Sequence, residues 1–341
     1  MSYLGSLLKN RSLVFGFFIL ILFALFFINV LVGSVAISFH DIVEIIFHHI
    51  TDSVKGAIIW KIRIPRAIAG IIGGAFLGIS GLLLQVFFRN PIVGPFILGI
   101  SSGASVMVSI VMLTTLTIGM TVLNPFMTTL AAFAGACGVM LIILSVASKV
   151  KSGVTLLIVG LMMGYLCHAV TSILTAFAES SKIKGFVLWQ LGSFSGFRWS
   201  EIYLLLILGG LILFMVYMLS KPLNAFLLGE DYASSMGVNI KLFRMLILLS
   251  ACALAGMITA IAGPVAFVGL AVPHMARLSF QTSDNRILIP GSILMGAIIC
   301  SLCDLIARSL LSPVELPLSA ITAFFGAPVV IFLLIKKRAA I

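Results

Sequence analysis

The sequence predicts an all-α polytopic membrane protein with ten transmembrane helices. Of its 341 residues, 61% are hydrophobic and 9% are charged, whereas soluble domains carry roughly 25% charged residues. This composition excludes a soluble enzyme. Apolar stretches near the length needed to cross a bilayer, about 20 residues, are predicted near 13–35, 64–87, 95–115, 123–147, 154–178, 201–220, 244–262, 264–279, 287–308 and 317–335.

The distribution of charge predicts the orientation of these spans. With ten spans and both termini in the cytoplasm, the inner loops hold thirteen Lys and Arg against three acids, and the outer loops hold eight against seven. Basic residues concentrate on the cytoplasmic side of membrane proteins. We therefore interpret the net charge of +11 as an orientation signal and expect no nucleic-acid partner.

Two stretches of the chain resemble each other. Residues 78–103 and 256–274 both run from a Gly-containing helix end into a Gly-Pro pair and then into an apolar segment. They precede spans three and eight, and an offset of five spans would invert the second copy, an arrangement common in transporters. Chance similarity between Gly-rich spans is the alternative. We predict one transmembrane domain, 1–341, with a first repeat of about 1–178, a polar segment at 179–200, and a second repeat of about 201–341.

The most polar stretch, KPLNAFLLGEDYASSMGVNIKLFR, begins at Lys221 and ends at Arg244. It is too polar to cross a bilayer, and it is placed in the cytoplasm by the charge distribution, between spans six and seven. Its pattern predicts one or two short amphipathic helices at the membrane surface within 221–243. The chain has no G-x-x-x-x-G-K-[ST] motif, so any work driven by ATP needs another polypeptide.

Few residues suggest chemistry inside the predicted spans. Gly70, Gly74 and Gly78 recur at four-residue intervals, which favours close helix packing over phosphate binding. We predict no catalytic constellation and no metal site; His168 is interpreted as a packing residue, with a metal or haem ligand as the alternative. Asp304 and Arg308 are spaced to pair on one helix face. The outer basic cluster around Arg63 and Arg66 fits either interfacial anchoring or docking of an acidic partner.

Five blocks in the same order resemble the FecCD-type permeases of type II ABC importers, which include the vitamin B12, ferric-siderophore and haem permeases. The blocks are RIPRAIAGIIGGAFLGISGLLLQVFFRNPIVGPFILGISSGA (63–104), VLWQLGSFSG (187–196), LNAFLLGEDYASSMGVN (223–239), GPVAFVGLAVPHMARL (263–278) and LCDLIARSLLSPVELPLSAITAFFGAPVVIFLL (302–334). One departure follows span eight, where the family reads close to G-x-D-H-R and this chain reads QTSDNR (281–286).

The resemblance implies roles for three groups of residues. Residues that dock an external substrate-binding protein would be Arg63, Arg66 and Arg308. Residues of paired helices that couple to an ATPase would be Leu223, Asn224, Gly229, Glu230, Ala233 and Gly237. Residues of an outer gate segment would be Trp189, Gly192, Ser193 and Gly196.

The resemblance also implies a function and partners. The expected protein is a homodimeric permease of the cell inner (cytoplasmic) membrane, joined by two ATP-binding cassette ATPase subunits and an external binding protein. It would have no chemical step and bind no cofactor, because ATP and Mg act in the ATPase chains. We expect a ferric siderophore as cargo, then haem, then cobalamin or a metal oxyanion. The alternative function is an ion-coupled secondary carrier, which would require acidic residues within the membrane as proton or ion sites.

Overall fold

In the computed structural model, described for residues 11–51, 53–114, 125–147, 149–150, 153–312 and 314–338, all regular structure is helical. In chain order, the structure begins with α2 (Arg11–Leu31), α3 (Phe39–Phe47), α4 (Val54–Ile58), the π-helical turn η1 (Ile59–Arg63), α5 (Ile64–Phe87), α6 (Ile100–Leu113), α7 (Pro125–Ala147) and α8 (Gly153–Ala176). It continues with α9 (Ser180–Leu191), α10 (Trp199–Met218), α11 (Ser220–Leu228), α12 (Glu230–Ser235), α13 (Ile240–Ala262), α14 (Val268–Phe280), α15 (Asn285–Ser309) and α16 (Leu318–Arg338).

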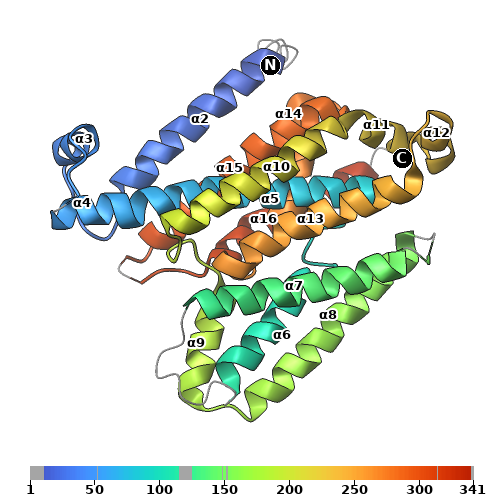
Figure 1. Cartoon of the computed structure of the whole chain (residues 1–341). Helices are drawn as coiled ribbons and strands as arrows, with labels where there is room; N and C mark the ends of the chain where they lie inside the picture. Colours follow the sequence, from blue (N-terminus) through green and yellow to red (C-terminus); the bar gives the residue numbers. More distant parts are fainter. Residues whose placement is uncertain are drawn as a thin grey trace.

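Helix α5 lies at the centre of the bundle, where α2, α10, α13, α14 and α15 pack around it (Figure 1). Nearly all of its side chains are buried, which is unusual for a surface helix and explains why its sequence is apolar on every face. Its partner α15 approaches most closely at Gly74, where an added Cβ would lie 2.0 Å from the carbonyl oxygen of Gly296. The predicted role of the small residues in close helix packing is confirmed at this crossing.

A second group of helices, α6 to α9, lies to one side of this bundle (Figure 1). Within this group, α6 contacts α7, α8 and α9. Helix α13 contacts both α5 and α7, so it connects this group to the bundle around α5. The short helices α3 and α4 lie at one end of the long helices, and α11 and α12 lie at the other end (Figure 1). The predicted outer and inner loops are thus separated by the length of the bundle.

Two of the expected spans begin later than predicted, for the same local reason. Helix α6 starts at Ile100 rather than near 95, and α14 starts at Val268 rather than 264. Each follows a Gly-Pro loop, and each is preceded by a residue in the left-handed region, Gly99 at φ +74° and Phe267 at φ +63°. Proline and left-handed backbone both interrupt a preceding helix. The matched geometry supports the proposed repeat, which stays a prediction.

Seven helices of the described residues are long and apolar enough to cross a membrane. They are Arg11–Leu31, the continuous stretch Val54–Phe87, Phe126–Ala147, Gly153–Ala176, Trp199–Met218, Ile240–Ala262 and Asn285–Ser309. Helices α6, α14 and α16 overlap the other three predicted spans, so the count of ten stays a prediction. Both termini lie outside the described residues, and their cytoplasmic placement likewise stays a prediction.

The crossing of α5 and α15 yields a stability prediction. The substitution Gly74→Ala should lower the free energy of unfolding by about 1–3 kcal/mol, because the methyl group meets the backbone of Gly296 and the helices must separate. Thermal unfolding of the purified protein in detergent measures the change. Gly210→Ala in α10, where the added Cβ has open space, should leave the unfolding temperature unchanged or raise it. Equal behaviour of the two variants would contradict the predicted steric constraint.

Candidate functional site

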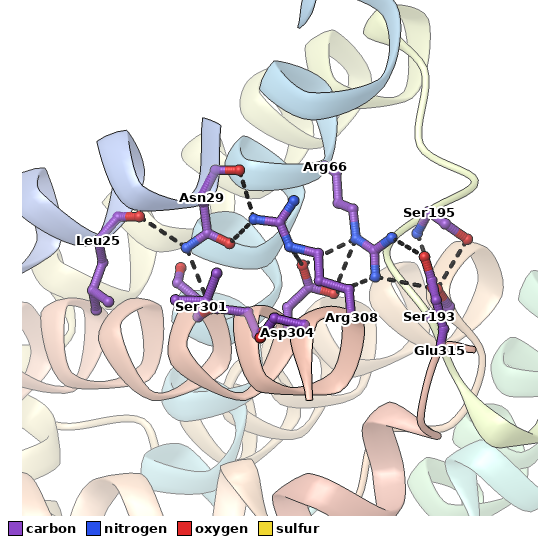
Figure 2. Close-up of polar contacts among 11 residues, drawn as sticks. Leu25, Asn29, Arg66, Ser193, Ser195, Ser301, Asp304, Arg308 and Glu315 are labelled. Atoms are coloured by element: carbon purple, nitrogen blue, oxygen red, sulfur yellow. Dashed lines mark hydrogen bonds and ion pairs between the residues drawn. The ribbon is translucent and has the colours of Figure 1, made fainter. Parts of the chain in front are cut away.

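The outer arginine cluster, named for the side that it is predicted to face, comprises Arg63, Arg66 and Arg308, which the structure brings together where α5 begins and α15 ends. Arg66 is the centre of the cluster (Figure 2). Its Nε donates to both carboxylate oxygens of Asp304 at 3.2 and 3.0 Å, and its Nη1 donates to Oε1 of Glu315 at 2.6 Å. Its Nη2 donates to both acids, at 3.0 and 3.1 Å. One guanidinium therefore binds two carboxylates, each through a bidentate pair.

Arg308 is held by α2. Its Nη2 donates to the backbone oxygen of Asn29 at 2.5 Å and to the Asn29 side-chain oxygen at 2.7 Å. The Asn29 amide in turn donates to the carbonyl oxygens of Leu25 and Ser301 (Figure 2). Arg308 Nε lies 3.8 Å from Asp304, which confirms the predicted pairing of these two residues, although Nε itself makes no hydrogen bond.

Arg63 caps the outer end of α2. Its Nη1 donates to the carbonyl oxygens of Val30 and Leu31 at 2.9 Å each, and its Nη2 donates to that of Val35. These carbonyls belong to the last turn of α2 and the chain just after it, where backbone oxygens lack helical partners. A cationic side chain at a helix C-terminus is also favoured electrostatically. Arg63 thereby fixes the direction in which α2 leaves the bundle.

The three arginines line one cavity of about 170 Å³. Their side chains are almost fully buried, whereas the side chain of Glu315 is 45% exposed. Three cations face two carboxylates here, so the cluster keeps one unmatched positive charge beside the cavity. The docking role of Arg63, Arg66 and Arg308 stays a prediction, and the burial means that a docking group must enter the cavity to reach them.

The predicted coupling residues lie together at the opposite end, in α11 and α12. Leu223 and Ala233 are fully buried against the bundle, and the chain between the two helices turns at Gly229. Gly229 at φ +140° and Gly237 at φ +83° hold backbone conformations that favour glycine. The exposed surface of this segment is mixed: Leu227, Leu228, Tyr232 and Met236 are apolar, and Asp231, Ser234 and Ser235 are polar. Glu230 lies 4.0 Å from Arg244, at the start of α13.

Asn224 connects these short helices to the inner end of α15. Its amide donates to Asp284 at 2.6 Å, and its oxygen accepts hydrogen bonds at 2.8 Å from both the backbone and side-chain nitrogens of Asn285. Asp284 is the N-cap of α15. Hydrogen bonds from the backbone of Arg286 and from Asn224 hold the pKa of Asp284 below its ordinary value. The changed sequence QTSDNR thus still provides a helix cap and two partners for Asn224.

The predicted gate residues lie at the end of α9 and in the turn after it. The backbone nitrogen of Ser193 donates to the carbonyl of Ala262 at 2.9 Å, and the carbonyl of Gly192 accepts from Leu318 at 3.3 Å. These bonds tie the segment to the end of α13 and the start of α16. Trp189 lies half-buried in α9, and Gly196 is exposed. A gating role stays a prediction.

A second cavity, of about 290 Å³, lies between α6, α8, α9 and the loop before α14. It is lined by Phe96, Ser101, Ser102, Ser105, His168, Thr171, Gln190, Pro264, Ala266 and Ser319. None of these lining residues is Asp, Glu, Lys or Arg, and most offer a hydroxyl or amide. His168 also lines a neighbouring pocket with Thr175 and Phe186, so its side chain faces open space rather than the packed core predicted for it.

Sequence reasoning missed Asn29, Glu315 and Asn285. Asn29 is an isolated amide within an apolar span, and an intramembrane polar group signals a buried partner. Glu315 and Asn285 follow helix boundaries and carry no such signal, because their partners lie 249 and 61 residues away in the chain.

Comparison with known proteins places these features in a family. A model of the FecCD transport family matches residues 20–336. The chain is 36% identical over 280 residues to the vitamin B12 import system permease protein BtuC of Salmonella typhi, covering 82% of this chain and 84% of that protein. It is 37% identical over 288 residues to BtuC of Klebsiella pneumoniae, covering 84% and 85%.

Two solved structures share the fold. An inward-facing conformation of a putative metal-chelate type ABC transporter superposes with a TM-score of 0.83 and 28% identity, covering 95% of this chain and 99% of that one. PsaBC from Streptococcus pneumoniae, in complex with Fab, has a TM-score of 0.51 and 16% identity, covering 79% and 89%, and shows likeness of fold alone. Together with the family match over nearly the whole chain, these relatives show that the protein belongs to the FecCD transport family and is a permease of the ABC-importer type.

Proposed function

We propose that this chain is the membrane-spanning subunit of an ATP-driven importer for a corrinoid such as cobalamin. The observation that carries the proposal is the identity of 36–37% to vitamin B12 permeases over more than four-fifths of both chains. The expected order of cargoes, with a ferric siderophore first and haem second, has no such support and is reversed here. Family membership also counts against the ion-coupled secondary carrier.

The cavity beside His168 is chemically suited to a neutral, polar cargo. Its hydroxyl and amide groups donate and accept hydrogen bonds without a fixed formal charge among the described lining residues. A corrinoid presents carboxamide groups around its rim, which such a lining can solvate during passage. Another metal chelate is the second candidate, favoured by the solved structure of a metal-chelate type transporter.

The proposed mechanism places the chemistry in other chains. Two ATPase subunits would bind ATP and Mg and would press on α11 and α12, where exposed Leu228, Tyr232 and Met236 would supply apolar contacts. The permease would act as a homodimer in the inner membrane, would receive cargo from an external binding protein docked at the outer arginine cluster, and would itself carry out no chemical step.

Helix α15 gives the two ends of the protein a direct mechanical connection. Its N-cap is bound by Asn224 of α11, and its last turns carry Asp304 and Arg308 of the outer cluster. Twenty residues of helix between Asp284 and Asp304 span about 30 Å. A displacement of α11 by the ATPase would therefore move the outer cluster, provided that the hydrogen bonds of Asn224 transmit it.

Cargo identity is tested by transport into proteoliposomes that hold the permease with its partner ATPase and external binding protein. We expect ATP-dependent uptake of radiolabelled cyanocobalamin that ends when ATP is replaced by a non-hydrolysable analogue. Ferric hydroxamate and haem serve as competing cargoes in the same vesicles. Uptake of either of these without uptake of cyanocobalamin would contradict the corrinoid proposal while leaving the importer class intact.

The connection through Asn224 is tested by Asn224→Ala. The variant removes three hydrogen bonds and leaves the buried Asn285 amide without its partner, so α11 should move without carrying α15. We expect the ATPase to remain bound and active while uptake per ATP hydrolysed falls about fivefold or more, the range of a typical coupling energy. Ser235→Ala on α12, which loses one local hydrogen bond, is the matched control. Parallel loss of ATPase binding and transport in Asn224→Ala would argue against transmission through this residue.

A further inference from the structure

The guanidinium of Arg66 has no free face for an incoming carboxylate. A guanidinium presents two bidentate faces to carboxylates, the Nε–Nη2 side and the Nη1–Nη2 end. Asp304 occupies the first and Glu315 occupies the second, with five hydrogen bonds between 2.6 and 3.2 Å. A docking protein that binds Arg66 through a carboxylate must therefore replace one of the two acids.

The two acids differ in how replaceable they are. The side chain of Asp304 is 3% exposed, belongs to the helical part of α15, and also lies 3.8 Å from Arg308. Removing such a group would leave buried cations without a partner, which is strongly unfavourable. Glu315 is 45% exposed and belongs to the loop between α15 and α16. Exposed partners of an ion pair contribute little net energy, because water solvates them when they separate.

We propose that Glu315 is an internal substitute for the docking partner's carboxylate. In the free permease it occupies the outer face of Arg66, and on docking it exchanges with an acidic side chain of the external protein. The incoming group reaches Arg66 through the cavity lined by Arg63, Arg308 and Glu315 itself. This exchange rests on the proposed docking at the outer arginine cluster. It adds that Glu315 competes with the docking partner for Arg66.

The exchange has two functions that a simple contact lacks. It keeps the buried Arg66 paired at all times, so the cluster is never left with two unmatched cations. It also lowers the affinity of docking, because the partner's carboxylate must displace Glu315 and therefore replaces an ion pair that already exists. When Glu315 leaves Arg66, the loop residues 314–317 lose their side-chain attachment to α5 and keep the backbone hydrogen bond from Leu316 to the carbonyl of Ala307 in α15, at 2.8 Å. Occupancy of the outer face therefore changes how firmly this part of the loop is held.

The first experiment measures the affinity of the external binding protein for the full permease–ATPase complex in nanodiscs. Glu315→Gln retains the shape of the side chain and removes its charge. Glu315→Ala leaves the Nη1–Nη2 end of Arg66 without its carboxylate. Both variants should bind the external protein about three- to tenfold more tightly than the wild type, which corresponds to roughly 0.7–1.4 kcal/mol. Glu179→Gln, an exposed acid at the N-terminus of α9, makes the same change in charge away from Arg66 and serves as the control.

The second experiment follows the loop directly. A nitroxide attached to Val314→Cys, beside Glu315 and exposed, should become more mobile when the binding protein docks. Unchanged or weaker affinity in both Glu315 variants, or a gain equal to that of Glu179→Gln, would overturn the exchange, as would an immobile label on docking. If the wild-type complex binds no external protein at all, the proposed docking site fails instead, and this outcome is distinct from failure of the exchange.

Discussion

The contact between α5 and α15 is the constraint on which the other features of the molecule depend. Midway along both helices, Gly74 and Gly296 bring the two backbones together. At the outer end, the buried pair of Arg66 and Asp304 fixes their relative position. Burying these charges is favourable only because they are fully hydrogen-bonded to each other and to Glu315. The two helices therefore behave as one rigid unit around which the remaining helices pack.

This unit connects regions for which the family resemblance implies separate roles. Arg66 of the outer cluster is 238 residues from its partner Asp304 in α15, and Asn224 of α11 is 60 residues from its partner Asp284, the N-cap of α15. Both regions therefore contact the same helix. A rigid helix with specific polar contacts at each end transmits displacement without any change in its own structure. The proposed coupling through α15 rests on these specific contacts rather than on proximity alone, because each end has a defined partner that can be removed separately.

Much of this architecture could be predicted from the sequence, and the reasons for success and failure are physical. Apolar length located most spans because the bilayer imposes it, and the short helices α11 and α12 form where the sequence is most polar. The later starts of α6 and α14 were not predicted, because hydropathy does not report the left-handed backbone conformation at Gly99 and Phe267. The arginines were identified, but their burial was not. Pairing of Arg66 with Glu315 is a tertiary contact that no local pattern encodes.

The late starts of α6 and α14 have a consequence for the electrostatics of the cavity beside His168. Ser101 and Ser102 in the first turn of α6, and Pro264 and Ala266 just before α14, all line this space. Two helix N-termini therefore face it, and the aligned peptide dipoles leave partial positive charge at each. The backbone thus supplies a field that does not depend on the protonation of a side chain and therefore persists at any pH. Carbonyl oxygens on a passing solute would be stabilised there, while small cations would be repelled.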